Sequence, residues 1–264
     1  MPVPELPLVS ILTPSYNQGR FIEETIRSVL TQDYPNLEYL IVDGGSTDGS
    51  LEVIQRYANQ LAWWVSEKDR GQTEAINKGF SHARGEIFAW LNSDDTYLHG
   101  AVARAVAYLQ AHPEAPLVYA DANLIDEQGQ VIGQFPSHQT DLARLLRGSV
   151  HIPQQTTFFR ASAWKQVAPL DESFHFAMDY DLWVRLSKLG PLIYTPGLWA
   201  NFRLHGGGKS LTIDDRCYPE MIRVYQRECG RRPSLLQARW LARRTLYAWL
   251  PLRLRVKLRK ILTF

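Results

Sequence analysis

The sequence predicts an α/β protein with a mainly parallel sheet flanked by helices, and three observations support this class. Short runs of Val, Ile, Leu and Trp alternate with helical patterns over the first two thirds of the 264 residues, which is typical of βαβ units. Several runs end in Asp, Asn or Gly, at the sheet edge where ligands bind. Hydrophobic residues make up 45% and charged residues 21%, as in folded globular proteins. We therefore expect one large domain over residues 1–230 and a basic tail over residues 231–264.

The first half contains four apolar runs, each followed by a segment of helical periodicity. Turn-forming residues separate the runs from the helical segments. After the first run, apolar residues recur at intervals of three and four, so they share one helix face. The expected strands are residues 9–13, 37–42, 62–65 and 87–91, and the expected helices are residues 21–31, 51–57, 73–83 and 101–110.

Strict alternation of strands and helices ends in the second half. After an expected strand at residues 117–120, the segment 124–132 has the pattern of a hairpin around Gly129. Acidic residues near the start of a later segment favour a helix there, because the positive end of the helix dipole attracts negative charge. The remaining expected elements are a strand at residues 156–159, helices at 161–167, 179–189 and 215–228, and an extended segment at 200–205.

The apolar run that begins at Ile87 stops at the sequence Asn92-Ser-Asp-Asp95. Two carboxylates about 4 Å apart repel each other by roughly 4 kcal/mol at an effective dielectric of about 20, and a bound divalent cation removes this cost. Mg²⁺ and Mn²⁺ prefer oxygen ligands and often share them with the phosphates of a substrate. Taken alone, the motif is more often the cap of the following helix, so a metal site needs support from other motifs.

The ends of the first strands would bring six polar or aromatic residues to one crevice. An aromatic face, carboxylates and a metal are what a nucleotide site requires. The first strand is not followed by Gly-x-Gly-x-x-Gly, and the chain has no P-loop motif, which argues against a dinucleotide fold and a P-loop enzyme. The six residues are Thr13, Tyr16, Asp43, Asp69, Asp94 and Asp95.

Four motifs in order make the chain resemble the family-2 glycosyltransferases, which have the GT-A fold. They are Val-Ser-Ile-Leu-Thr-Pro-Ser-Tyr-Asn-Gln at residues 9–18, Ile-Val-Asp-Gly-Gly-Ser-Thr-Asp-Gly at 41–49, Asp-Arg-Gly-Gln-Thr-Glu-Ala-Ile-Asn-Lys-Gly at 69–79 and Ala-Trp-Leu-Asn-Ser-Asp-Asp at 89–95. A looser likeness continues to about residue 210. The resemblance implies a Rossmann-like GT-A sheet and an inverting, metal-dependent transfer of a sugar from a nucleoside diphosphate to a glycan or lipid-linked glycan, in cell-surface polysaccharide synthesis.

The resemblance also implies a role for each motif residue at the donor. Asp95 would bind the Mn²⁺ or Mg²⁺ that bridges the diphosphate, and Asp94 would lie near the ribose. The family has Asp at the position of Asn92, so metal affinity would depend mainly on Asp95 and the phosphates. The residues implied to hold the nucleoside are Thr13, Pro14 and Tyr16, which frame it, Asp43, which bonds the base, and Asp69 with Arg70, which line the same pocket.

An inverting transfer needs a carboxylate that deprotonates the acceptor hydroxyl. Phe-Ala-Met-Asp-Tyr-Asp-Leu-Trp at residues 176–183 resembles the Glu-Asp segment of the family, with Met178 in place of the Glu. The resemblance implies that Asp179 is the base. On spacing alone, Asp179 is more often the N-cap of a helix. Asp181 is two residues further on, points in another direction on a helix, and is a weaker candidate for contact with the acceptor.

His205 lies in the sequence Arg-Leu-His-Gly-Gly-Gly-Lys-Ser at residues 203–210, which resembles a late loop of the family that reaches the diphosphate or the metal. The glycines allow close approach of the backbone, and Lys209 offers a positive charge to phosphate. A lone His is more often structural, but in this context we expect His205 to be a metal ligand.

A weaker prediction concerns the acceptor. The segment beginning at His151 could line the acceptor cleft through Gln154 and Gln155, together with Trp183 or Trp199. A buried aromatic side chain is usually part of the core, so the two Trp residues are the less secure part of this hypothesis.

The formal charge of +2 conceals a division along the chain. Residues 231–264 contain ten Lys or Arg and no Asp or Glu, which leaves 19 basic and 27 acidic residues, a net of −8, for the first 230. A nucleic-acid binder more often carries positive charge on the fold itself. The tail is expected to be a helix, either solvated and packed on the domain or adsorbed on anionic lipid, where each Lys or Arg contributes about 1 kcal/mol. We favour adsorption, because it would bring the site to a lipid-linked acceptor.

The sequence shows neither a secretory leader nor the roughly 18 apolar residues of a membrane span. We therefore expect a cytoplasmic protein at the inner face of the cell membrane. Cys217 and Cys229 are too few to staple a chain of this length, so both are expected to be reduced thiols.

Two other functions remain open at this point. A sugar-phosphate nucleotidyltransferase shares the sheet architecture but needs a Gly-rich, basic loop near its start, whereas residues 15–20 contain one Gly and one Arg. A membrane-bound protein that binds nucleotide sugars without turnover is the second alternative. The donor sugar, the acceptor and the linkage depend on loop geometry, which the sequence does not specify.

Overall fold

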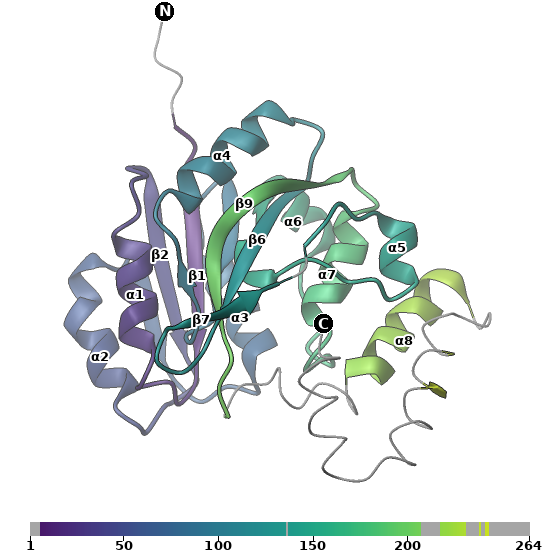
Figure 1. Cartoon of the computed structure of the whole chain (residues 1–264). Coiled ribbons are helices and arrows are strands. Elements are labelled where there is room, and N and C mark those ends of the chain that lie inside the picture. Colours follow the sequence, from purple (N-terminus) through teal and green to yellow (C-terminus); the bar gives the residue numbers. More distant parts are fainter. Residues whose placement is uncertain (1–5, 136, 207–216, 231–237, 239–240, 243–264) are drawn as a thin grey trace, which may run out of the picture.

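The computed structural model describes residues 6–135, 137–206, 217–230, 238 and 241–242 (Figure 1). Within these residues a nine-stranded sheet is covered by helices. The strands are β1 (Val9–Ser15), β2 (Leu37–Asp43), β3 (Trp63–Ser66), β4 (Ile87–Trp90), β5 (Thr96–Tyr97), β6 (Leu117–Ile125), β7 (Val131–Gln134), β8 (Phe158–Arg160) and β9 (Leu192–Arg203). The helices are α1 (Ile22–Leu30), α2 (Ser50–Tyr57), η1 (Ala58–Gln60), α3 (Gln72–His82), α4 (Ala101–Ala111), α5 (Leu142–Leu146), η2 (Gln154–Thr156), α6 (Ala161–Val167), α7 (Met178–Leu186) and α8 (Cys217–Cys229).

The strands follow the order β3-β2-β1-β4-β8-β6-β9-β5 across the sheet, and β7 pairs with β6. β3, β2, β1 and β4 are parallel, and Val9 of β1 lies opposite Leu37 of β2 and Ile87 of β4. Beyond β4 the pairing is mixed, because β8 is antiparallel to β4 and β6 while β6 and β9 are parallel. The carboxyl ends of the first four strands therefore meet at one edge, as the sequence predicted.

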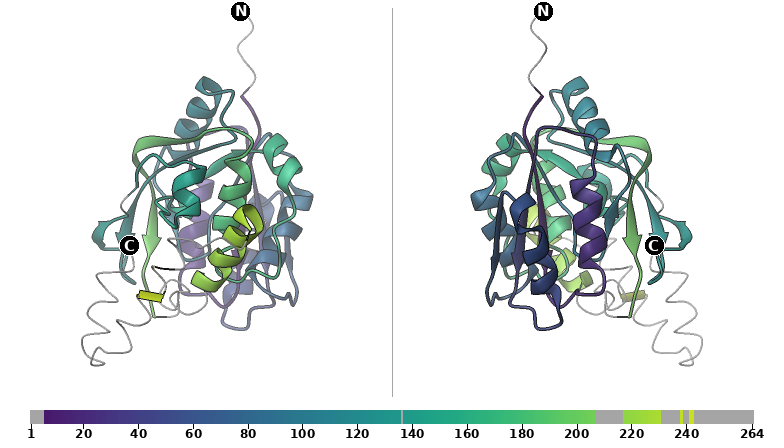
Figure 2. Two further views of the ribbon diagram at one scale, coloured as in Figure 1. Left: turned by 90° about the vertical axis from the view of Figure 1, so that its right-hand side faces the viewer. Right: turned by 90° about the vertical axis from the view of Figure 1, so that its left-hand side faces the viewer.

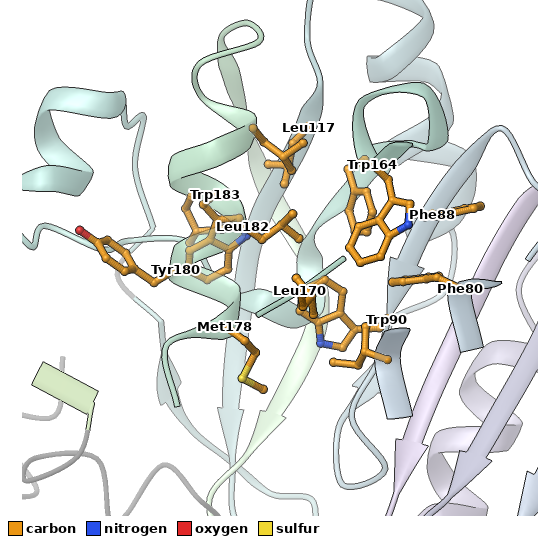
Figure 3. Packing of buried hydrophobic residues seen from close by; sticks show 14 of the residues in the cluster. Phe80, Phe88, Trp90, Leu117, Trp164, Leu170, Met178, Tyr180, Leu182 and Trp183 are labelled. Carbon is orange, nitrogen blue, oxygen red and sulfur yellow. The ribbon is translucent and has the colours of Figure 1, made fainter. Parts of the chain in front are cut away.

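Two apolar layers hold the helices against the sheet. One layer includes α3, α6, α7 and α8, and the other includes α1, α2 and α4. In the first layer Phe80 stacks on Phe88 of β4 with ring centroids 4.9 Å apart, and Trp90 packs edge-on against Phe80 (Figure 3). Burial of each such side chain stabilises the fold by roughly 1.5–3 kcal/mol. This packing fixes β4 up to the turn that follows it. Figure 2 shows α8 at the opposite end of the molecule from α1 and α2.

The structure confirms each strand and helix predicted in the first half, to within two residues at each end. Between β4 and α4 it adds β5, and in the second half it adds α5 and the first part of β9, while the strand expected at residues 156–159 begins at Phe158 instead. The short β5 and α5 have no detectable periodicity. Pro196 and Gly197 interrupt the pattern of β9, but Gly197 has a φ of 124° at a bulge in the β6–β9 pairing, where its N–H donates to Asp121 Oδ2 at 3.0 Å.

The basic tail predicted for residues 231–264 lies outside the described residues apart from positions 238, 241 and 242, and Lys209 also lies outside them. None of the helices in the described part of the chain combines the length and the apolar character that a membrane span requires. Cys217 and Cys229 form no disulfide bond with each other.

Candidate functional site

The turn after β4 carries two aspartates in different environments. Asp95 is 1% exposed, and its Oδ1 accepts the backbone N–H of Arg203 at 2.9 Å. Its second carboxylate oxygen is buried and has no hydrogen-bond donor among the described residues. The backbone carbonyl of Asp95 accepts the hydroxyl of Thr25 at 2.7 Å. Asp95 therefore anchors the turn to the end of β9 and to α1.

Asp94 faces a second candidate ligand. Its Oδ2 lies 2.9 Å from Nε2 of His205, and the two side chains are 18% and 8% exposed. The imidazole packs against Phe21, with ring centroids 4.7 Å apart. Metal or ribose contacts were predicted for Asp94, Asp95 and His205, and the structure brings two of these residues, Asp94 and His205, into direct contact.

Arg203 holds this arrangement and was not singled out in the sequence. It is 2% exposed, its Nε donates to the backbone carbonyl of Asp94 at 2.9 Å, and its guanidinium also pairs with Glu24. The same guanidinium lies over the ring of Phe21, 4.8 Å from its centroid. An arginine two residues before His205 was the available signal, but the chain contains 29 Lys and Arg residues and this one was not distinguishable from the others.

Burial, and then the negative charge of Asp94, raise the pKa of Asp95 well above its usual range. Burial therefore disfavours, at Asp95, the charged carboxylate that metal binding requires. Asp94 and His205 instead offer a carboxylate oxygen and an imidazole nitrogen, both of which bind Mn²⁺ and similar cations.

The described residues contain no cluster of three or more His, Cys, Asp or Glu that could hold a metal. Two protein ligands nevertheless fit a cation whose other ligands are substrate phosphates and water, because such cations are commonly held by one or two carboxylates together with phosphates.

The end of β1 presents one exposed aromatic side chain. Tyr16 is 62% exposed, whereas Thr13 is fully buried and shares a hydrogen bond with the Tyr39 hydroxyl at 2.8 Å. Pro14 is also buried. Direct contact with a nucleoside is therefore available to Tyr16, while Thr13 and Pro14 form the strand beneath it.

Asp43, at the end of β2, is fully buried. Its carboxylate accepts the N–H groups of Gly45 and Ser46 at 3.2 and 2.9 Å, and the hydroxyls of Ser46 and Ser66 at 2.5 and 2.6 Å. These four bonds shape the turn after β2 and tie it to β3. The contact between Asp43 and the base stays a prediction: Oδ2 accepts three of these bonds, and Oδ1 accepts the Ser46 hydroxyl.

Asp69 lies beside the same turn. Its Oδ1 accepts the N–H of Gly71 at 2.9 Å, and a Cβ at Gly44 would come within 2.8 Å of its Oδ2. Partial burial raises its pKa. Asp69 is thus packed against Gly44, and a side chain at that glycine would displace it.

Arg70 is exposed and bridges two parts of the chain. It pairs with Glu74 at 3.0 Å and with Glu172 at 2.6 Å. A small hollow beside it is lined by residues 70–74, Glu172 and His175. Arg70 therefore links the start of α3 to the segment that precedes α7.

Asn92 has a partner within the protein. Its Oδ1 accepts Nε2 of Gln72 at 2.7 Å. Asn92 therefore gives the turn after β4 a neutral hydrogen bond to α3.

The two acidic residues of α7 differ in access. Asp181 is fully buried and pairs with Arg185 at 2.9 Å and with Arg227 at 2.6 Å. Asp179 is partly exposed in the first turn, and the N-cap is Ala177, so Asp179 is not the cap that its spacing suggested. The ion pairs of Asp181 place it in the structural core, against the predicted contact with an acceptor. Asp179 is therefore the more exposed of the two.

The residues predicted to line an acceptor cleft divide in the same way. Gln154 is partly exposed, and its Nε2 donates to the carbonyl of Trp90 at 2.8 Å, next to the turn after β4. Gln155, Trp183 and Trp199 are 3%, 2% and 1% exposed. Their burial contradicts a cleft-lining role, and Gln154 alone remains near the site.

Solved structures with a similar fold bind nucleotides. TarS of S. aureus, in complex with UDP, has a TM-score of 0.67 and 20% sequence identity, with coverage of 84% of this chain and 65% of that chain. The mannosyltransferase PcManGT from Pyrobaculum calidifontis, in complex with GDP-Man and Mn²⁺, has a TM-score of 0.67 and 22% identity, with coverage of 90% and 70%. These likenesses establish the GT-A type of fold.

Sequence relatives agree with the fold. The chain is 31% identical to chondroitin synthase of Escherichia coli over 78% of this chain and 30% of that protein. It is 29% identical to an uncharacterized glycosyltransferase of Rickettsia felis over 78% of this chain and 36% of that protein, and 32% identical to the O-antigen biosynthesis protein RfbC of Myxococcus xanthus over 69% and 14%. The chain thus spans about a third or less of the length of these relatives.

The family model of glycosyl transferase family 2 matches residues 10–178, which include β1 to β4 and the Asp94–Asp95 turn. The chain belongs to glycosyl transferase family 2.

Proposed function

We propose that the chain transfers a sugar from a nucleoside diphosphate donor to a hydroxyl of a glycan or lipid-linked glycan, as a step of cell-surface polysaccharide synthesis. The observation that carries this proposal is the 2.9 Å contact between Asp94 and His205, at the edge where four parallel strands end. Chondroitin synthase and RfbC are among the relatives, and TarS and PcManGT are solved with nucleotide ligands, which supports a polysaccharide acceptor and a nucleotide donor. Membership of glycosyl transferase family 2 argues against the alternative function of a sugar-phosphate nucleotidyltransferase.

Asp94 and His205 would hold a Mn²⁺ or Mg²⁺ ion, and Tyr16 would offer a face to the nucleoside. The ion would stabilise the negative charge of the departing diphosphate. The contact of Asp94 with His205, together with the burial of Asp95, supports Asp94 rather than Asp95 as the carboxylate ligand.

Asp179 would act as the base of an inverting transfer. The acceptor oxygen bonds to the anomeric carbon as the bond from that carbon to the diphosphate breaks, and the hydroxyl proton passes to Asp179. The partial exposure of Asp179 and the buried ion pairs of Asp181 support this choice between the two.

Donor turnover tests the proposal. UDP-GlcNAc, UDP-glucose and GDP-mannose are incubated in turn with the protein and Mn²⁺, and release of UDP or GDP is measured with and without EDTA. The proposal expects release from at least one donor, and loss of that release in EDTA. Binding of a donor without any release would favour the alternative of a non-catalytic nucleotide-sugar-binding protein.

The basic residues of the segment 231–264 support a second, separate proposal, that the tail adsorbs on an anionic membrane surface at the inner face of the cell membrane. Co-sedimentation with phosphatidylserine vesicles is compared for the chain with and without this segment. The proposal expects binding that is lost on truncation and at high salt, and equal binding of the two chains rejects it.

A further inference from the structure

Glu220 of α8 lies outside the family match at residues 10–178 and belongs to none of the predicted sites. It is 9% exposed, so its carboxylate is almost completely removed from water. Its Oε2 accepts the backbone N–H groups of Phe176 and Ala177, both at 2.8 Å, and its two oxygens lie 3.0 and 3.1 Å from the N–H of His175. One side chain thus binds three consecutive amides.

These amides belong to the three residues directly before α7, the helix that carries Asp179. The first N–H groups of a helix have no partner within the helix and are usually satisfied by a polar side chain at the N-cap. The N-cap of α7 is Ala177, which has no such side chain. Glu220, more than 40 residues further along the chain, instead accepts the N–H of Ala177 itself and the N–H groups of the two residues before it, and its negative charge is favourable at the positive end of the helix.

Two arginines extend the contact between α8 and this segment. Arg223 donates to the Ser173 hydroxyl at 2.7 Å and lies over the ring of Phe174, 4.6 Å from its centroid. Arg227 pairs with Asp181 at 2.6 Å. Because positions 220, 223 and 227 share one helical face, a single face of α8 holds the chain from Ser173 to Asp181.

We propose that Glu220 is the positioning residue for the base, Asp179. By fixing the three amides that precede the helix, it sets the direction of the first turn and hence of the Asp179 carboxylate. The inference rests on the proposed role of Asp179. The candidate donor contacts come from β1, the turn after β4 and His205, so loss of Glu220 affects turnover and leaves donor binding in place.

The test compares Glu220→Ala and Glu220→Gln with Glu228→Gln. Glu228 is the matched control, because it is on the same helix and pairs with Lys188 and with Arg227, both at 2.9 Å, without contacting the amides before α7. Three quantities are measured: kcat for release of UDP or GDP from the active donor, the Kd of UDP with Mn²⁺ by calorimetry, and amide hydrogen exchange of residues 173–181.

Glu220→Ala is expected to lower kcat about 10- to 100-fold, since a misplacement of about 1 Å at a reacting group costs this much. The Kd of UDP should stay within about twofold, and exchange at residues 175–180 should become faster. Glu220→Gln keeps one acceptor oxygen and should fall between Glu220→Ala and the unchanged protein. Glu228→Gln should match the unchanged protein in all three measurements.

A double-mutant cycle with Asp179→Asn tests whether Glu220 affects the rate through Asp179. If Glu220 acts through Asp179, adding Glu220→Ala to Asp179→Asn lowers the residual rate no further. An unchanged kcat in Glu220→Ala, an equal loss in both backgrounds, or a parallel loss of UDP binding overturns the inference. If Glu220→Ala does not fold, the same comparison is made with Glu220→Gln, which keeps the volume of the side chain.

Failure of the proposed function gives a different result. The unchanged protein would then release no nucleotide from any donor, while hydrogen exchange still reports whether Glu220 orders the amides before α7. Unchanged exchange in both Glu220 variants overturns the inference whatever the activity of the protein.

Discussion

The two halves of the sheet hold their functional side chains by different means. Around β1 to β4, Asp43 and Asp69 bind backbone N–H groups only two or three residues away in the chain. On the β9 and α7 side, His205 and Asp179 are positioned by groups from distant segments, through the contacts of Arg203 and Glu220. Figures 1 and 2 place α8, which supplies Glu220, far from α1 and α2.

This difference leads us to assign different functions to the two halves. In the proposed function, the short-range turns would form the edge that holds the nucleotide, whereas long-range contacts would bring the proposed metal ligands together and direct the proposed base. Substitutions in the two halves should therefore separate donor binding from turnover, and substitutions at neighbouring aspartates should separate chemistry from folding.

The largest effect is expected for Asp179→Asn. Loss of a general base lowers rates by roughly 10²- to 10⁴-fold, so kcat for donor turnover should fall by this amount while the Kd of UDP with Mn²⁺ is unchanged. Kinetics and calorimetry on the same preparation make the comparison. A variant that keeps its turnover would remove Asp179 from the mechanism.

Asp181→Asn serves as the contrast within the same helix. Its carboxylate is buried between Arg185 and Arg227, and removing one partner of a buried ion pair costs about 3 kcal/mol or more. Urea unfolding should report this loss, with kcat per folded molecule largely retained. Loss of turnover in Asp181→Asn alone would mean that the base had been assigned to the wrong aspartate.

Asp94→Asn is expected to weaken Mn²⁺-dependent binding of UDP by about 10- to 100-fold, because it removes the charged member of the Asp94–His205 pair. Binding measured in EDTA should hardly change. His205→Ala should behave in the same way, and Asp95→Asn is the matched control that keeps the metal effect. The opposite pattern, with the effect in Asp95→Asn only, would support the original assignment of the metal to Asp95.

The smallest effect is expected for Asp95→Asn, in the pH dependence of stability. The raised pKa of Asp95 in the folded state means that, as the pH rises above the ordinary Asp range, the unfolded chain loses this proton first, and folding becomes less favourable until the folded-state pKa is passed. The variant lacks this cost. As the pH rises, the free energy of unfolding of the variant should therefore increase relative to that of the unchanged protein. Urea unfolding in EDTA over a pH series measures the difference, and a difference that is independent of pH would contradict the assignment.

The sequence predicted the parallel half of the fold well because its signals are local. The apolar runs end directly at Asp43 and at the Asp94–Asp95 turn, and a resemblance in four ordered motifs placed these residues at one edge. Local patterns do not show, however, whether a polar residue at a strand end faces solvent or the protein. For this reason the burial of Thr13, Asp43 and Gln155 could not be predicted from the sequence.

The long-range contacts could not be predicted in the same way. Nothing in the pattern around Arg203 or Glu220 indicates that one holds the carbonyl of Asp94 and the other the amides before α7. The division of roles between Asp94 and Asp95 also depends on which carboxylate faces His205, which is set by the register of β9 beside the turn. The bulge at Gly197 shifts that register, and no sequence period shows it.

The most direct test of a metal-dependent donor site is a thermal-shift series of nucleoside diphosphates with and without Mn²⁺. A ligand present at about 100 times its Kd stabilises a protein by roughly 2.7 kcal/mol, which corresponds to a rise in Tm of about 5 °C or more for a chain of this size. At least one of UDP, GDP, CDP and dTDP is expected to raise Tm by this amount with Mn²⁺ and not in EDTA. If none of them raises Tm, or if the rise is equal in EDTA, the metal-dependent donor site proposed at Asp94 and His205 is contradicted.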